Sequence, residues 1–462
     1  MARSATLIPD LCRGNRRVSQ LSNGMRVMSY EDNTGVAGLS LYSRMGPRFE
    51  TARTAGATSV LEAAVLLGNE ARDENRLCRD LYSLGSSFRS SSDVREIFGW
   101  SMNVPRFSVK DGLAFLENAA LHPKLDDATV AAAKSTAAQR SLFSDRDSTR
   151  VCFEMIHQAA FGDVALGRPL WHTPEEIERL DVATVRDFHA NFVQPDRSVL
   201  VASGIDDHDG LVAAIEAQFQ WPDKLAKPHE FGKDLGYVGG VALRENDKAP
   251  DSVTKFQEKN LTHIGLCFKG IPLRHPDYFA YTVIQTLLGG GTSFSSGGPG
   301  KGMHTKLFRE AIMQQGWLHG VECISAWYEN AGLIGLYGQA EHQYAKPLLN
   351  LMMYQAATIP ARVTDKDVEM AKNQLMSQLV LLAEARDIAL DECSKLLLQH
   401  NTVVLPDDLL RGAEKIKLDD IQRVCKDLVA TPPTLVVYGN TKDVPTAEQV
   451  STTVKSIHKR YC

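Results

Sequence analysis

The sequence predicts a fold of mixed α and β layers, built from two similar halves. Strand-like and helix-like segments alternate in blocks along the 462 residues, which is typical of layered α and β structure. A helical pattern, prolines and an apolar strand also occur twice in the same order, ending at Gly204 in "SVLVASG" and at Gly439 in "TLVVYG". These two endings lie about half a chain apart, which favours a duplication. The alternative is two unrelated α/β domains that end alike by chance.

The first half begins with a predicted hairpin. In "VSQLSNGMRVMSY" alternating residues flank Ser22–Gly24, which is a turn signal. A helical pattern follows in "GATSVLEAAVLLGNEARDENRLCRDLYSLG", and "REIFGWSMNV" then has the pattern of a strand. We expect further helices over about 108–161, with a break near His122 and Pro123, and then over about 174–192 and 209–218.

The second half repeats the helix that closes the first. The apolar spacing of one helix equals that of the other, as three pairs of positions show: Leu180 and Ile416, Val185 and Ile421, Phe188 and Val424. Between the halves, "WPDKLAKPHEFGKDLGYVGG" is rich in Pro, Gly and charge, as interdomain linkers are. We therefore expect an N-terminal domain over 18–222, a linker over 223–250 and a C-terminal domain over 251–462.

The composition excludes several classes of protein. With 44% hydrophobic and 23% charged residues, the chain has ordinary values for a folded globular protein. A net charge of −5 provides no positive field for nucleic acid or anionic lipid, and apolar runs such as "AAVLL" are too short to span a membrane. The eight cysteines are scattered without a C-x-x-C pair, which argues against a cysteine zinc site and is typical of a reducing compartment.

The first seventeen residues, "MARSATLIPDLCRGNRR", hold four arginines and a single acid, Asp10. A basic and nearly acid-free start is typical of a mitochondrial transit segment, so residues 1–17 are a candidate for one. The alternative is an ordinary basic terminus, because Pro9 and Gly14 weaken any amphipathic helix there.

A glycine-rich stretch in the second half has seven glycines in the fourteen positions from Gly289 to Gly302. A Walker phosphate loop would require glycine at Ser295 and a hydroxyl at Gly302, and a dinucleotide loop would require glycine at Phe294. These substitutions argue against nucleotide binding. Bare backbone can instead approach a varied partner closely.

The sequence has no local zinc or serine-nucleophile motif. The thirteen histidines are never closer than His263 and His275, so no helix presents two imidazoles one turn apart, and G-x-S-x-G is absent. Cys152, Glu154 and His157 share one helical stretch without a common face, and we expect His157 to be a packed core or boundary residue.

Several stretches resemble one known family. "GGGTSFSSGGPGKGMHTKLF" closely resembles the glycine-rich loop of the processing-peptidase branch of the pitrilysin-type metallopeptidases. "LSNGMRV" resembles the opening hairpin of that family, "GATSVLEAAVLLGN" its zinc-helix region, "ALGRPLWHTPEEIERL" a segment near the end of the first half, and "AKNQLMSQLVLLAE" a long helix of the second. The resemblance covers nearly the whole chain. It implies an α+β fold whose two homologous halves, each a mostly antiparallel sheet packed with helices, face each other like a clam shell.

The departures from the family pattern concern its zinc site. Catalytic members carry H-x-x-E-H, in which two imidazoles hold zinc and the carboxylate activates water. The matching positions here are Ser59, Glu62 and Ala63, and a third ligand would fall at Gln139 or Arg140. With these degenerate metal positions, the resemblance implies no metal, no other cofactor and no peptidase activity in the chain on its own.

The role that the resemblance leaves is recognition of presequences, which are arginine-rich and poor in acids. The substrate-binding candidates in the loop are Gly289, Gly290, Gly291, Phe294, Gly297, Gly298, Gly300 and Gly302. Matching to the family adds Glu329 and the pair Asp391 and Glu392 as carboxylates for arginine. The alternative for each acid is a solvated surface charge.

The implied partners are a zinc-bearing beta subunit of the same family and the presequences of imported precursors, in the mitochondrial matrix. The same family also contains structural core subunits of the ubiquinol-cytochrome c reductase complex, respiratory complex III, at the matrix face of the inner membrane. This chain could therefore be such a core subunit, or have both roles. The intact glycine-rich loop favours the recognition role, because dedicated core subunits typically have eroded loops.

Overall fold

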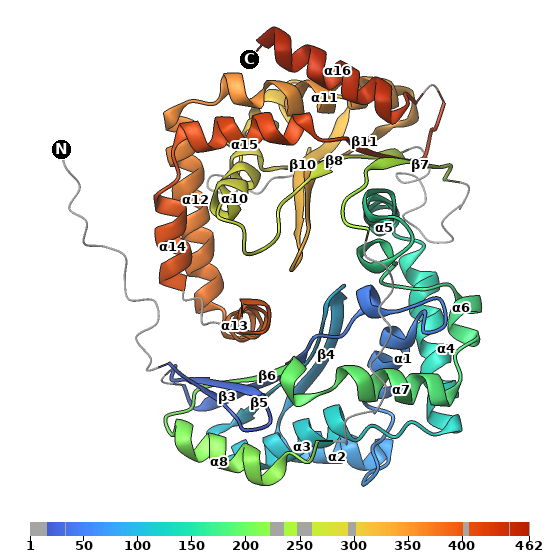
Figure 1. Ribbon diagram of the computed structural model, residues 1–462, viewed down its shortest axis with the longest axis vertical. Helices are drawn as coiled ribbons and strands as arrows, with labels where there is room; N and C mark the ends of the chain where they lie inside the picture. The colour runs from blue at the N-terminus through green and yellow to red at the C-terminus, as the bar shows by residue number, and fades with distance from the viewer. Residues whose placement is uncertain are drawn as a thin grey trace, which may run out of the picture. The chain divides into compact units, whose positions relative to one another are not determined.

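The computed structural model describes residues 16–32, 34–221, 235–246, 261–293, 302–400, 406–442 and 444–461. These residues form two compact units (Figure 1). Unit 1 comprises the described residues of 1–142, 170–233 and 379–408, and unit 2 those of 143–169, 234–378 and 409–462. In each unit the described strands form one six-stranded sheet.

The sheet of unit 1 has one parallel contact, between β2 and β6, and is otherwise antiparallel. Its strands, in spatial order, are β1 (Arg17–Gln20), β2 (Arg26–Tyr30), β6 (Ser198–Ser203), β3 (Val36–Ser43), β5 (Ile97–Pro105) and β4 (Ser87–Val94). The predicted hairpin is confirmed, since β1 pairs with β2 and Gly24 has the positive φ of 94° that its turn requires.

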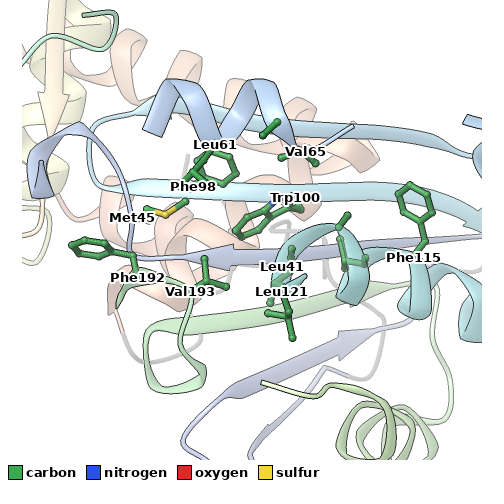
Figure 2. Packing of buried hydrophobic residues seen from close by; sticks show 14 of the residues in the cluster. Leu41, Met45, Leu61, Val65, Phe98, Trp100, Phe115, Leu121, Phe192 and Val193 are labelled. Atoms are coloured by element: carbon green, nitrogen blue, oxygen red, sulfur yellow. The ribbon is translucent and has the colours of Figure 1, made fainter. Parts of the chain in front are cut away.

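The core of unit 1 lies between one face of this sheet and a layer of helices. Figure 2 shows part of it, where Leu41, Phe98 and Trp100 from the strands meet Leu61 and Leu121 from two helices. The helices of the unit include α1 (Ala57–Ala64), α2 (Glu74–Leu84), α3 (Val109–Leu121), α4 (Asp127–Ser144), α6 (Pro174–Glu178), α7 (Val182–Phe192) and α8 (His208–Gln218). The boundary of the unit falls within α4, after Leu142. Leu61 is on α1, so this packing fixes the helix that carries the degenerate metal positions.

The sheet of unit 2 repeats this topology. Its strands, in spatial order, are β7 (Gly240–Arg244), β12 (Thr434–Tyr438), β8 (Leu261–Lys269), β11 (Gly332–Glu341), β10 (Leu318–Trp327) and β9 (Gly290–Thr292). Without β1 and β9, each sheet has five strands connected in the same order, with a parallel pair at the same place. The predicted duplication and the mostly antiparallel α+β fold are therefore confirmed.

Helices cover both faces of the second sheet, and the main contacts with its strands are made by α5 (Ser148–Phe161), α10 (Tyr278–Leu288), α11 (Ala345–Arg362) and α15 (Leu418–Ala430). The unit also contains α16 (Ala447–Tyr461), the part of α12 (Asp365–Glu384) as far as Gln378, and the part of α14 (Pro406–Glu414) from Leu409. On the α5 face, Cys152, Ile156 and Phe161 pack in one cluster with Val436 and Tyr438 of the sheet. No helix of the described part of the chain is long and apolar enough to cross a membrane.

The two halves of the sequence exchange one helix each. α5 comes from the first half and packs on β8 and β12 of unit 2, whereas α13 (Arg386–His400) comes from the second half and packs on β3 and β6 of unit 1. The predicted division into 18–222 and 251–462 did not include this exchange, in which each helix buries apolar side chains on the sheet formed by the other half of the sequence; the boundaries themselves stay a prediction. The predicted linker 223–250 also contains the strand β7.

Three predicted helical stretches are each divided by an aspartate. Asp73, Asp147 and Asp181 are N-cap residues whose side chains accept backbone N–H groups of α2, α5 and α7. A new helix therefore begins after each of them. The break predicted near His122 is confirmed, since α3 ends at Leu121 and α4 begins at Asp127. Arg16 stacks over the ring of Tyr30 and Arg17 begins β1, so the candidate transit segment 1–17 overlaps the folded unit at its end.

Candidate functional site

Helix α1, which carries three of the degenerate metal positions, is held at its N-terminus by a buried carboxylate. The N–H groups of Gly56 and Thr58 donate to Glu50 at 2.9 and 2.8 Å. Gly56 precedes the helix with φ of 88°, a conformation that glycine adopts without strain. The negative charge of Glu50 is favourable there, because the first N–H groups of a helix have no partner within it.

A buried ion pair neutralises Glu50. His172 Nε2 lies 2.7 Å from Glu50 Oε2, and the exposed fractions of the two side chains are 1% and 0%. Burial lowers the pKa of His172, but the charge of Glu50 and the contact with Glu176 outweigh this and raise the pKa to about 9. Burial alone would raise the pKa of Glu50, but the charge of His172 and the two N–H groups hold it below its usual value. At neutral pH both side chains are therefore charged.

The degenerate metal positions make other contacts. Ser59 Oγ donates to the carbonyl oxygen of Leu170 at 3.2 Å, and Ala63 packs against the core of unit 1. Arg140, on α4, lies with Nη1 3.3 Å from Glu62 Oε1. Gln139 is exposed on the same helix. A guanidinium thus lies beside the carboxylate that would activate water in a catalytic member.

This donor set does not fit zinc. Ser59 and Ala63 offer no imidazole, and Arg140 is a cation that repels a metal ion. Among the described residues, no group of three or more His, Cys, Asp or Glu side chains is arranged to hold a metal. At the predicted metal positions of α1 the one carboxylate is Glu62, and it is paired with Arg140.

The beginning of the glycine-rich stretch is an edge strand. Gly290, Gly291 and Thr292 form β9 and pair with β10, and Gly290 is opposite Glu322. Gly289, Gly290 and Gly291 have φ values of 53°, 108° and 145°. A Cβ at position 290 would collide with the backbone of β10, and the positive φ there is one that other residues rarely adopt. Only glycine therefore fits at this position.

Thr305 joins the two described ends of the stretch. Its Oγ1 accepts the N–H of Gly290 at 3.3 Å and donates to the carbonyl oxygen of Gly302 at 2.7 Å, and its own N–H donates to the same oxygen at 2.9 Å. The residue is 3% exposed. Phe294, Gly297, Gly298 and Gly300 lie outside the described residues. Thr305 was not among the predicted site residues, although a hydroxyl three residues after Gly302 is a visible signal.

The predicted acidic pair lies on α13 in unit 1, and its two members differ. Asp391 accepts a hydrogen bond from the hydroxyl of Tyr42 and lies 2.6 Å from Lys395 Nζ, with 20% of its side chain exposed. Glu392 is 53% exposed and lies 3.4 Å from the same Nζ. Asp391 therefore helps to fix α13 on the sheet, whereas Glu392 is the more accessible to a ligand.

Glu329, the third predicted acid, lies in unit 2 between β10 and β11. Its side chain is 39% exposed and its Oε1 is 4.0 Å from Arg274 Nη2. The carboxylate is thus partly accessible and already near one guanidinium. It belongs to the same unit as the described ends of the glycine-rich stretch, whereas Asp391 and Glu392 belong to the other.

Comparison with known proteins gives two family matches. The model described as "Insulinase (Peptidase family M16)" matches residues 26–174, and the model described as "Peptidase M16 inactive domain" matches residues 179–375. Together the matches include α1, α4 and the whole glycine-rich stretch from Gly289 to Gly302.

Individual relatives align over most of the chain. A protein of Pongo abelii named mitochondrial-processing peptidase subunit alpha is 24% identical over 451 residues, which cover 95% of this chain and 85% of the relative. The protein of that name from Solanum tuberosum is 26% identical over 455 residues, 97% of this chain and 87% of the relative. A Schizosaccharomyces pombe protein named as a probable subunit alpha is 26% identical over 441 residues, 93% of this chain and 86% of the relative.

Proposed function

Because the chain belongs to peptidase family M16, we propose that it acts as the non-catalytic, substrate-recognising alpha subunit of a mitochondrial processing peptidase. The observation that carries this proposal is the pair formed by Arg140 and Glu62 on α4 and α1. Glu62 is the one carboxylate that remains at the positions of the family's zinc motif, and the guanidinium of Arg140 lies beside it. Ser59 and Ala63 stand where catalytic members have histidines. The relatives named as alpha subunits support the same assignment.

In this function the chain binds the presequence of a precursor, and a partner subunit cleaves it. The partner is a zinc-bearing beta subunit of the same family, and the ligands are the presequences of precursors imported into the mitochondrial matrix. Presequences are amphipathic and rich in arginine, so they require both carboxylates and apolar surface. The exposed Glu392 and the partly exposed Glu329 are candidate carboxylates, and the glycine-rich stretch is a candidate for backbone contact.

The test is a native pull-down of the full chain from its own mitochondria, with the bound proteins identified. We expect a zinc-bearing member of family M16 and activity against presequence-bearing precursors in the same fraction. Recovery with a haem-containing membrane complex and no peptidase activity would instead identify a core subunit of ubiquinol-cytochrome c reductase and would contradict the proposal.

A further inference from the structure

The end of α12 and the start of α13 expose an unusual set of side chains. Leu381, Leu382 and Ile388 are 63%, 43% and 43% exposed, although they lie within eight residues of one another. Single exposed apolar side chains are common, but a local group of them marks an interaction surface. Glu384 and Asp387 lie between them in the sequence and are exposed as well. We refer to these five residues as the corner patch.

The charges around the corner patch are unbalanced toward the negative. Residues 381–395 contain four carboxylates and two cations. Arg386 donates to Thr34 Oγ1 and to the backbone oxygen of Val36 at 3.1 Å, and to Asn103 Oδ1 at 2.8 Å. Lys395 lies against Asp391 and Glu392. Both cations are therefore occupied by contacts within unit 1.

Glu384 lies at the junction of two helices. It is the last residue of α12, and α13 begins two residues later at Arg386. Asp387 lies in the first turn of α13, where a carboxylate is favourable, and its Oδ1 accepts a hydrogen bond from Asn103 Nδ2 at 2.9 Å. The two exposed carboxylates of the patch therefore give it negative charge beside its apolar side chains.

From these observations we infer that the corner patch docks a basic, amphipathic peptide. The apolar face of such a peptide covers Leu381, Leu382 and Ile388, and its arginines approach Glu384 and Asp387. This inference rests on the proposed function, because presequences have this chemistry. The inference adds an apolar docking surface beside the predicted acidic residues Asp391 and Glu392.

A second pair of exposed apolar side chains lies in surroundings of a different charge. Leu142 is 53% exposed and Phe143 67% exposed at the end of α4. The guanidinium of Arg146 lies 5.4 Å from the centre of the Phe143 ring. Residues 140–150 contain three arginines and two aspartates, whereas residues 381–395 contain four carboxylates and two cations. A basic peptide is therefore attracted less to Leu142 than to the corner patch, and Leu142 is a matched control for its leucines.

The test measures the affinity of the full chain for a fluorescent synthetic peptide of about 15 residues, with Leu and Arg at helical spacing. Glutamine is the replacement because it is polar and keeps helix propensity. We expect Leu381→Gln with Leu382→Gln to raise the Kd about tenfold, since two apolar contacts are lost. Glu384→Gln should raise it about threefold at low salt and little at about 0.5 M salt. Leu142→Gln should leave it unchanged.

The outcomes separate the inference from the function on which it rests. If the wild-type chain binds the peptide and the Leu381→Gln, Leu382→Gln variant binds it equally well, the corner patch is not the docking surface, although the proposed function stands. If the wild-type chain binds no such peptide, the proposed function fails first. If the variant loses association with a protein subunit while its peptide affinity is unchanged, the patch is a subunit interface and the inference is wrong. Ile388→Gln gives an independent measurement if the double variant is unstable.

Discussion

At the scale of single residues, the helix with three of the predicted metal positions, α1, is held at its N-terminus by a buried ion pair. Glu50 and His172 form a buried ion pair that fixes the N-terminus of α1, and the N–H groups of Gly56 and Thr58 depend on the charge of Glu50. Removing one partner of such a pair leaves the other charge buried and uncompensated. The position of α1 is therefore sensitive to the protonation of His172.

The ion pair predicts a loss of stability in alkaline solution. The pKa of His172 is about 9 in the folded chain and near 6.5 when unfolded, so its contribution is complete below pH 6.5 and is lost as the pH rises through 9. We expect the free energy of unfolding in urea to fall by about 3 kcal/mol between pH 6.5 and 9.5 from this group. His172→Gln should be less stable at pH 6.5 by about 3 kcal/mol and should have a flatter profile over that range. Equal profiles for the two proteins would contradict the assignment.

The degenerate metal positions predict that zinc binding can be restored. The wild-type chain should take up no stoichiometric zinc, because Ser59, Ala63 and Arg140 are not ligands. Combining Ser59→His, Ala63→His and Arg140→Glu supplies two imidazoles and a carboxylate, and zinc affinity should rise at least about a hundredfold by calorimetry. Arg140→Gln alone is the control and should bind no zinc. Stoichiometric zinc in the wild-type protein would contradict the account.

Matching to the family located Ser59, Glu62 and Ala63, because the segment "GATSVLEAAVLLGN" around them resembles the zinc-helix region of that family. It could not find the ion pair of Glu50 with His172, because these residues are 122 positions apart and are joined only by folding. The contact between Arg140 and Glu62 was missed for the same reason, although Arg140 was named as a candidate position. The roles of Asp391 and Glu392 as arginine ligands stay predictions. The two side chains differ in exposure, because that of Asp391 is 20% exposed and that of Glu392 is 53% exposed.

At the scale of elements, the glycine-rich stretch is defined by how its ends are held. β9 adds an edge strand that has no counterpart among the described strands of unit 1, and Thr305 connects Gly290 to Gly302. The strand β9 was not predicted, because a run of three glycines has low strand propensity and only pairing with β10 stabilises it. Thr305 therefore holds these two described ends close together.

The contacts of Thr305 predict a selective effect on binding. Thr305→Val keeps the shape of the side chain but loses two hydrogen bonds, and should cost about 1 to 2 kcal/mol of stability. If the stretch contacts presequences, the same variant should also raise the Kd for a presequence peptide about threefold to tenfold. Thr305→Ser keeps Oγ1 and should restore both values, as measured by urea unfolding and fluorescence anisotropy. A Thr305→Ser variant as weak as Thr305→Val would show that the methyl group matters instead.

At the scale of the whole molecule, each half of the sequence contributes one helix, α5 or α13, to the unit built mainly from the other half. The repeat was visible in the sequence, because Val185 and Ile421 occupy equivalent positions in α7 and α15. The exchange was not visible, since helix patterns do not reveal which sheet a helix covers. The facing arrangement of the halves stays a prediction from the family resemblance.

The exchange predicts that neither half folds well alone. Residues 16–222 lack α13, whose Leu390, Leu397 and Leu398 pack with Met28 and Val201 of the first sheet. Without that cover the half-chain exposes an apolar sheet face and should aggregate. Expression of 16–222 and 223–462, separately and together, checks this by size-exclusion chromatography and thermal unfolding. A soluble 16–222 fragment with a cooperative transition would show that α13 is dispensable.

The central claim is that this chain recognises presequences and leaves their cleavage to a partner. The most direct measurement is the cleavage of a fluorogenic presequence peptide by the purified full chain, by a zinc-bearing beta subunit of the family, and by the two together. We predict that the chain alone binds the peptide without cleaving it, and that efficient cleavage appears only when both subunits are present. Chelator-sensitive cleavage by the chain alone, or full cleavage by the partner without it, would contradict the account.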